Sequence, residues 1–481
     1  MISFLISIAI LILGYFVYGN ILERIFGVNE HNKTPANRLA DGVDFVVLPN
    51  WKVFLIQFLN IAGLGPIFGA IAGAMFGPVA FLWIVFGSIF AGSVHDYFSG
   101  MLSLRHEGKS ISEVVGIYLG RNTQQIMRVF TVLLLIFVGT VFLVGPAKIL
   151  DGMTDGFLSV WGWVAIILVY YFLSTLLPID KVISKVYPVF GVAMLLMAVG
   201  LLGVLMFGDY HIPELTYDNL RNMSSSPQDT PIFPILFVTI ACGAISGFHS
   251  TQSPLMARCM GNEKSGKVIF AGTMITEGIV ALIWAAVSMT FFGSVEELNG
   301  AMALNGNNAA WAANEISLKM LGPVGGILAL FGIVAAPITS GDTAFRSARL
   351  IIADTFNVSQ IKFSKRLLLS LPLFAIAVAL TQIEFGIIWR YFAWSNQTLA
   401  TIVLWTISIY LVQSSKNYWV ALIPAIFMTA VCSTYILIAP EGFGLNSALS
   451  YPIALFFTLI VLAWFVVRGK KISKVNHVNN E

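Results

Sequence analysis

Apolar runs of membrane length recur from one end of this chain to the other. Each run holds about 18 to 26 residues, enough for a helix to cross a hydrocarbon core of about 30 Å. Because lipid offers no partner to backbone N–H and C=O groups, such runs cross it as α-helices. We therefore predict an all-α polytopic membrane protein with about thirteen transmembrane helices, near residues 3–20, 53–76, 79–103, 125–147, 160–177, 184–207, 232–256, 267–292, 323–345, 366–382, 388–412, 417–439 and 448–467.

The distribution of charge fits this fold class and orients it. Charged residues make up 11% of the 481-residue chain, against about 25% in soluble domains. Cytoplasmic segments of membrane proteins are enriched in Lys and Arg. With the N-terminus outside and the C-terminus in the cytoplasm, thirteen spans place 23 of the 27 basic residues inside. The four that remain outside are Lys148, Arg221, Lys319 and Arg390.

The second span contains a sequence that is unlike a continuous helix. It reads IAGLGPIFGAIAGAMFG from Ile61 to Gly77, with Gly63, Gly65 and Pro66 at its centre. Proline removes a backbone donor and clashes with the preceding turn, while glycine frees the backbone. A break at this depth persists only if it is buried in protein or lines a cavity. Close helix packing through small residues is the alternative, but it does not explain Pro66.

The seventh span carries a second candidate break, ACGAISGFHS at 241–250. Two interrupted spans in corresponding halves indicate a transporter's binding site. The breaks lie five spans apart, so we predict two five-helix repeats of inverted topology. We also predict that Gly63–Pro66 and Gly243–Gly247 are non-helical and lie within about 10 Å of each other near the bilayer midplane. The predicted parts are a helix and cytoplasmic loop (1–50), a ten-helix core (51–412, repeats 51–207 and 231–412), and two helices with a cytoplasmic tail (413–481).

Ionisable side chains inside spans are functional hypotheses, because they are costly in lipid. Glu277 lies near the middle of the eighth span. Burial favours the protonated form of a carboxyl group, so Glu277 could take up and release a proton. The alternative is a protonated carboxyl group that hydrogen-bonds two helices.

Two histidines and a second acid extend this set. Asp96 and His95 lie in the inner half of the third span, and their side chains need not act as a pair because neighbours on a helix diverge. His249 lies in the second break, where Ser246 and Ser253 share its face if the helix resumes there. A lone intramembrane histidine can also be an ordinary packing residue.

Several stretches resemble the carbon starvation protein CstA family. They are DGVDFV (41–46), Trp51, IAGLGP (61–66), AGSVHDY (91–97), CGAISGFHS (242–250), TEG (276–278), TSGDTAFRSAR (339–349) and AWSNQTLA (393–400). The family consists of bacterial inner-membrane secondary transporters of pyruvate and, for some members, peptides, with a fold of the amino acid–polyamine–organocation superfamily. This chain departs from longer members at Ile56 and Gln57, where they have two histidines, and at 251–254, where they have Ser-Gly-Thr-Thr.

The resemblance implies an ion-coupled importer of a small carboxylate such as pyruvate across the bacterial inner membrane. A transporter of peptides or amino acids is the alternative. A channel is disfavoured because channels usually show a repeated filter or a ring of charge from identical subunits, whereas this chain shows internal pseudo-symmetry. Half-helix N-termini favour a carboxylate. The predicted substrate-binding residues are Gly63, Gly65, Pro66, Gly243, Ser246, Gly247, His249, Ser250, Asn396 and Gln397.

A proton is favoured as the coupling ion, because Asp96, His95 and Glu277 are available to carry it. In sodium-coupled members of the wider superfamily, hydroxyls of the helix equivalent to the ninth span complete an ion site. Thr339 and Ser340 are therefore the candidate sodium ligands, since hard cations prefer oxygen. Asp342 is expected to pair with Arg346 at i+4.

No enzyme activity, cofactor or nucleic-acid partner is expected. The net charge is only +3, and no phosphate loop follows a strand. The three cysteines have neither metal-site nor disulfide spacing. The expected partners are a small substrate, a proton or sodium ion, and the lipid bilayer.

A cysteine introduced into the segment 293–322 tests the topology. The segment is predicted to lie outside, so a membrane-impermeant maleimide should label it in intact cells. Labelling that requires permeabilised cells would contradict the orientation. A cysteine in the tail beyond Lys470 is the matched control and should react only after permeabilisation.

Overall fold

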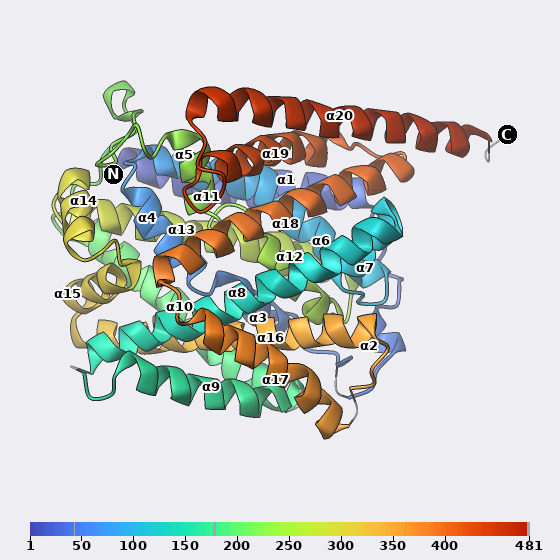
Figure 1. The fold of residues 1–481 in the computed structure, drawn as a ribbon, viewed down its shortest axis with the longest axis horizontal. Helices are drawn as coiled ribbons and strands as arrows, with labels where there is room; N and C mark the ends of the chain where they lie inside the picture. Colours follow the sequence, from blue (N-terminus) through green and yellow to red (C-terminus); the bar gives the residue numbers. More distant parts are fainter. Residues whose placement is uncertain (43, 155, 177–178, 361, 479–481) are drawn as a thin grey trace.

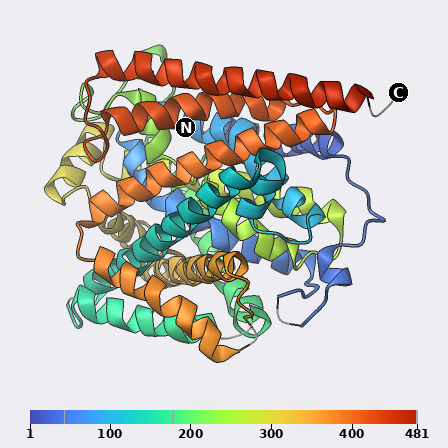
Figure 2. The same cartoon turned by 45° about the vertical axis from the view of Figure 1, so that its right-hand side comes forward.

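A computed structural model describes residues 1–42, 44–154, 156–176, 179–360 and 362–478. Within these ranges the chain is built from helices, without a β-strand and with one isolated bridge between Leu48 and Met260. The N-terminus, α4, α14 and α15 gather at one end of the molecule, and α2, α7 and the C-terminus at the other (Figure 1). Helices α18, α19 and α20 lie side by side along one edge in both views (Figure 2).

The helices follow the predicted apolar runs, with short 3-10 or π-helical turns marked η. The first half contains α1 (Ile2–Phe26), α2 (Pro35–Arg38), α3 (Asn50–Ala62), η1 (Gly65–Gly69), α4 (Ala70–Ala74), α5 (Val79–Gly87), η2 (Ser88–Gly92), α6 (Ser93–Arg105), α7 (Ile111–Leu119), α8 (Arg121–Met153), α9 (Val160–Leu176) and α10 (Ile179–Phe207). The second half contains η3 (Tyr217–Asn219), η4 (Ile232–Leu236), α11 (Phe237–Thr239), α12 (Gly247–Ala257), η5 (Glu263–Ser265), η6 (Lys267–Ala271), α13 (Gly272–Phe291), α14 (Val295–Leu304), α15 (Ala309–Ala329), η7 (Leu330–Ala335), α16 (Ala336–Thr355), α17 (Phe363–Leu380), α18 (Phe385–Gln413), α19 (Trp419–Ile438) and α20 (Ser447–Val478).

Ten helices in the described part of the chain are long and apolar enough to cross a membrane, or eleven if α3 and η1–α4 form one bent span. The two other predicted spans fall on α9, which has 17 residues, and on the interrupted region 232–257. The all-helical membrane fold is confirmed. The count of thirteen, the inverted repeat and the domain limits stay predictions.

The first break lies where the sequence predicts it but is shorter. Helix α3 ends at Ala62, and Gly63 adopts φ 32° and ψ −135°, a conformation that favours glycine. The chain then bends by 52° into η1 and α4. Gly65 and Pro66 were predicted to be non-helical, which is wrong, because they begin the π-helical turn η1. Proline fits there because the first residues of a helix need no backbone donor.

The second break runs from the end of α11 to the start of α12. Ile240 leaves the helical region with φ −93° and ψ 77°, and Gly243 lies in the non-helical turn that follows. Helix α12 begins at Gly247, with extended Ser246 before it. The prediction that Gly247 is part of the break is therefore wrong by one residue.

The two breaks pack directly against each other. A Cβ added at Gly65 would lie 2.3 Å from both Cβ and Sγ of Cys242, and one at Gly69 would lie 3.0 Å from the Thr239 carbonyl oxygen. Helix α12 then packs on α3, α6, α16 and α18. The predicted closeness of the breaks is confirmed, and it requires glycine on the first of them.

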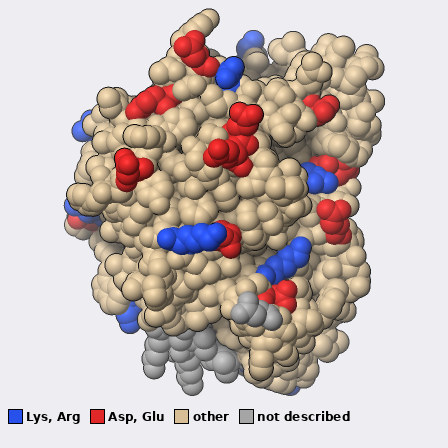
Figure 3. All heavy atoms as spheres, turned by 90° about the vertical axis from the view of Figure 1, so that its left-hand side faces the viewer, with Lys and Arg blue, Asp and Glu red and all other residues tan. Residues whose placement is uncertain are grey.

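The end that carries the N-terminus is formed in part by the segment 293–322, which the sequence analysis predicts to lie outside. It contains α14 and the first part of α15, which is interrupted at Gly322 with φ 58°. Acidic side chains are spread over this end, and lysines and arginines lie between them (Figure 3). The orientation of this end relative to the membrane stays a prediction.

Gly65→Ala tests the packing of the breaks. The new Cβ overlaps Cys242, and overpacking of this kind costs about 1–3 kcal/mol. The variant should show a lower apparent Tm in detergent, and Cys242→Gly should restore part of the loss because it removes both overlapping atoms. Gly152→Ala in α8 is the control, since nothing lies within 4 Å of that position. An unchanged Tm for Gly65→Ala would contradict the direct contact.

Candidate functional site

Four ionisable side chains meet next to the second break, and all are fully buried. His249 of α12 is central: its Nδ1 lies 2.7 Å from Asp96 Oδ2, and its Nε2 lies 3.2 Å from Glu277 Oε2. Asp96 Oδ1 lies 2.7 Å from Nδ1 of the adjacent His95. The order His95, Asp96, His249, Glu277, which we call the buried relay, joins α6, α12 and α13. The two neighbours on α6 do interact, because the His95 ring turns back toward Asp96.

Two π-helical turns lead into the helices that carry the acids. Turn η2 precedes α6, and η6 precedes α13; π turns are frequent at functional sites. The surrounding backbone is also very close. A Cβ at Gly92 would lie 2.3 Å from the Ala244 carbonyl oxygen, and one at Gly278 would lie 2.5 Å from Ser88 Oγ. Glycine at these points lets the start of α6 rest directly on the second break.

The side chain of Asn396, on α18, caps the start of α12. Its Oδ1 accepts a hydrogen bond from the Phe248 N–H at 2.6 Å, which replaces the side-chain cap that Ser246 does not provide. Ser246 Oγ lies 3.1 Å from Oδ1 and 3.0 Å from Nδ2 of Asn396. Gln397 points elsewhere and donates to the Phe237 carbonyl at 3.3 Å. Of the two predicted amides, Asn396 therefore lines the break and Gln397 bridges α18 to α11.

Some polar atoms of the buried relay have no hydrogen-bond partner. Within the described residues, His249 Nε2 and both Glu277 oxygens make no hydrogen bond of good geometry, although their separation of 3.2 Å is that of an ion pair. The hydroxyls on α12 are satisfied locally: Ser250 donates to the Gly247 carbonyl at 2.7 Å and Ser253 to the His249 carbonyl at 3.0 Å. The free capacity of the relay therefore lies between His249 and Glu277 and at His95 Nε2, which also has no hydrogen-bond partner among the described residues.

Cys242 is the site residue that the sequence did not reveal. Its Sγ, one atom of His249 and one of Glu277 lie within 4.8 Å of one another, a spacing that a metal ion could bridge. The three residues come from the second break, α12 and α13, so their sequence spacing carries no signal. An ion pair between His249 and Glu277 accounts for the same approach, and we assign no metal.

Gln57 and Asn60 are two further buried residues near the first break. They lie on α3, which packs against α12, and their amide atoms have no hydrogen-bond partner in the described part of the chain. Asn60 was not singled out from the sequence, although an amide in an apolar run is the same signal that marked Asn396.

The candidate sodium ligands on α16 face backbone carbonyls. Thr339 Oγ1 donates to the Ala336 carbonyl at 2.6 Å, and Ser340 Oγ donates to the Leu59 carbonyl at 2.9 Å. Ser340 thus ties α16 to the last turn of α3, and neither hydroxyl hydrogen-bonds to the buried relay in the described part of the chain.

The predicted ion pair of Asp342 with Arg346 is wrong for the described residues. Asp342 Oδ2 accepts from Ser174 Oγ at 2.6 Å and from the Tyr187 hydroxyl at 2.9 Å. Arg346 instead donates to the Ser174 carbonyl at 2.9 Å. The carboxylate finds hydroxyl donors on α9 and α10, so it does not need the guanidinium one turn away.

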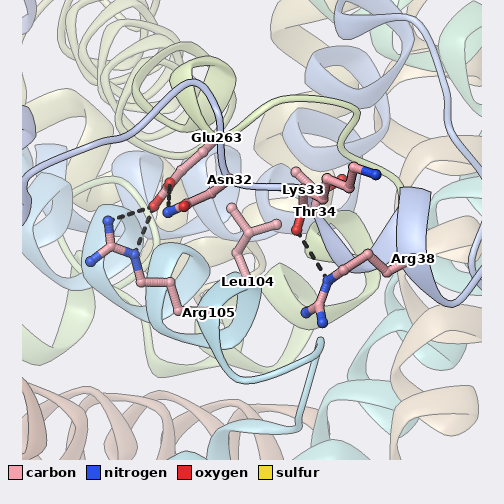
Figure 4. Close-up of a pocket in the computed structure, with 7 residues that line it drawn as sticks. All are labelled: Asn32, Lys33, Thr34, Arg38, Leu104, Arg105 and Glu263. Carbon is pink, nitrogen blue, oxygen red and sulfur yellow. Dashed lines mark hydrogen bonds and ion pairs between the residues drawn. The ribbon is translucent and has the colours of Figure 1, made fainter.

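The end opposite the N-terminus is tied together by Glu263. Arg105 and Asn32 both point toward this carboxylate (Figure 4), at 2.7 Å and 2.9 Å. Arg105 also donates to the Gly27 carbonyl at 2.7 Å. These bonds join the ends of α1 and α6 to η5 and border a cavity of about 260 Å³. Arg38 lies at the other side of this cavity and donates to the Lys33 carbonyl.

Asn396→Ala tests the role of the α18 amide. The change leaves the buried Phe248 N–H without an acceptor, which costs about 1–3 kcal/mol. We expect a lower apparent Tm in detergent together with weaker substrate binding, since the start of α12 would no longer be held. Gln397→Ala is the control and should lower stability without comparable loss of binding. Equal binding by parent and Asn396→Ala would contradict the role.

Comparisons with known proteins agree with this architecture. Among solved structures, one that matches is the Eremococcus coleocola manganese transporter in complex with an aromatic bis-isothiourea substituted compound. The match has a TM-score of 0.53 and 14% sequence identity, and it covers 90% of this chain and 99% of that one. This likeness shows the fold alone.

Related sequences are more specific. An uncharacterized membrane protein of Haemophilus influenzae is 42% identical over 63% of this chain and 94% of its own length. The peptide transporter CstA of Bacillus subtilis is 26% identical over 95% of both chains. The family model described as carbon starvation protein CstA matches residues 1–201 and 147–324. This chain is a multi-pass membrane protein that belongs to the carbon starvation protein CstA family.

Proposed function

We propose that this protein is a proton-coupled secondary transporter that imports a small carboxylate such as pyruvate across the bacterial inner membrane. The observation that carries the proposal is the position of His249, which touches Asp96 on one side and Glu277 on the other, beside a break in the same helix. A site for protons and a site for substrate would then share α12. No catalytic step is part of this proposal.

Electrostatics supply the coupling. A substrate carboxylate that approaches two ionised carboxyl groups in a buried site is repelled, and protonation of one of them removes the repulsion. Proton and anionic substrate would therefore enter together. The helix start at Ser246 and Gly247 would lie near the substrate, held by the hydrogen bonds of Asn396 with the Ser246 hydroxyl and the Phe248 N–H.

A short peptide is the second candidate substrate. The observation that favours it is that several relatives are named peptide transporter CstA, one of which matches 95% of this chain. A peptide also ends in a carboxylate, so the same coupling would apply. Sodium coupling through Thr339 and Ser340 is the alternative for the ion; both hydroxyls donate to backbone carbonyls, which leaves their oxygen lone pairs available to a cation.

Uptake into proteoliposomes distinguishes these possibilities. Labelled pyruvate and labelled dialanine are offered under an inward proton gradient, an inward sodium gradient, or neither. We expect the proton gradient alone to drive accumulation beyond equilibrium. Accumulation that follows only sodium would contradict proton coupling, and equilibration without accumulation under any gradient would contradict secondary active transport.

Glu277→Gln tests the relay within that assay. Glutamine keeps the shape of the side chain but cannot exchange a proton, so gradient-driven accumulation should fall at least tenfold while exchange of substrate across the membrane persists. Glu315→Gln is the matched control, because Glu315 lies at the protein surface and pairs with Lys319 at 2.6 Å. Full accumulation by Glu277→Gln would exclude the role, and loss of folded protein would identify the residue as structural.

A further inference from the structure

A second cavity, of about 380 Å³, lies at the end of the molecule that carries the N-terminus. Phe68 of η1 and Ala72 of α4 form part of its wall, so it lies directly on the first interrupted helix. The other sides come from Lys148 near the end of α8, the α14–α15 connection, and the start of α18. We call this cavity the vestibule. Its volume is within the range of small-ligand sites, about 300–1,000 Å³.

Charges of both signs converge on the vestibule. A Cβ at Gly386, in the first turn of α18, would lie 3.5 Å from Glu384 Oε1 and 3.6 Å from Arg390 Nη1. The absent side chain thus leaves an acidic and a basic group facing the same space. Lys148 is half-buried, and its Nζ lies 4.8 Å from the Phe385 ring centre, with no hydrogen bond to the described residues.

The two cations of the vestibule belong to a small set. Lys148 and Arg390 are two of the four basic residues that the sequence analysis assigns to the outer side. Of the other two, Lys319 is paired with Glu315 at 2.6 Å. Arg390 Nε donates a hydrogen bond to Glu441 Oε2 at 3.2 Å. Its Nη1 lies 3.6 Å from where a Cβ at Gly386 would be.

A line of aromatic rings runs from the vestibule to the second break. Phe68 and Trp389 have ring centres 5.7 Å apart, Trp389 and Phe392 5.5 Å, and Phe392 and Phe142 6.3 Å. Phe142 then lies 6.1 Å from Phe248 of α12. The vestibule is thus linked by packed rings to α12, the helix that carries His249 of the buried relay.

We propose that the vestibule is a binding site for short peptides with free ends. Lys148 and Arg390 would take the terminal carboxylate, Glu384 the terminal ammonium group, and Phe385 and Trp389 the apolar parts. Charge-assisted hydrogen bonds of this kind are the stronger ones in proteins. Pyruvate offers only the carboxylate and would use half of the site. The role of this site in uptake rests on the proposed transport function, but peptide binding to the vestibule can be measured without transport.

Equilibrium binding of labelled dialanine to the purified full chain in detergent tests the proposal. Lys148→Gln and Glu384→Gln should each raise the Kd for dialanine about tenfold or more, because hydrogen bonds to charged groups are worth about 1.5–3 kcal/mol. Binding of N-acetyl-dialanine, which lacks the ammonium group, should respond to Lys148→Gln but not to Glu384→Gln. Lys319→Gln is the control for surface charge and should leave both affinities unchanged.

Gly386→Leu provides a variant that leaves every charge in place. Leucine fills the space between Glu384 and Arg390, and it is favoured over glycine within a helix. Folding should persist, as checked by size-exclusion chromatography, and the Kd for dialanine should again rise about tenfold or more.

The outcomes separate the vestibule from the transport function. Unchanged dialanine affinity in Lys148→Gln and Gly386→Leu would overturn the vestibule, even if uptake is proton-driven as proposed. Equal effects of Glu384→Gln on dialanine and on its acetylated form would overturn the assignment of the ammonium group. The parent protein could also bind dialanine without accumulating it in proteoliposomes. Loss of affinity in the variants would then support the vestibule, while the missing accumulation would contradict the transport proposal.

Discussion

The contact of one imidazole with two carboxyl groups is the interaction on which the centre of this molecule depends. Asp96, His249 and Glu277 come from three different helices and are fully buried. Acids in such a place are tolerable only with a partner, and removal of one partner from a buried pair typically costs about 3–5 kcal/mol. His249 therefore holds α6, α12 and α13 together while it leaves hydrogen-bonding capacity free on the side of Glu277.

Two interrupted helices can lie beside this relay because their backbones are packed or capped. The first break has no side chain at Gly65, so Cys242 of the second break fits against it. The second break is closed by Asn396, whose side chain does what a residue of the same helix does in an ordinary cap. Polar backbone at membrane depth is thereby covered by protein, as the surrounding lipid demands.

The membrane fold and both breaks could be predicted from the sequence, because lipid imposes the length of apolar runs and because Gly63, Pro66 and Gly243 disfavour a continuous helix. The ends of the breaks could not, since Pro66 and Gly247 are compatible with the first turn of a helix. The relay was foreseen only as separate residues: Asp96 and His249 lie 153 positions apart, and their contact depends on how α6 and α12 pack. Cys242 and the partners of Asp342 depend on packing in the same way.

The π-helical turn η2 determines how α6, the helix that carries Asp96, is rotated about its axis relative to α5. A π turn contains one residue more than a regular arrangement would need, and each residue turns an α-helix by about 100°. If the hydrogen bonds of Ser88–Gly92 changed to the α pattern, everything after Gly92 would rotate by about that angle relative to α5. Asp96 would then turn away from His249. The orientation of this acid thus depends on how one surplus residue, one turn upstream, is accommodated: the π pattern absorbs it, whereas the α pattern would pass its rotation on to Asp96.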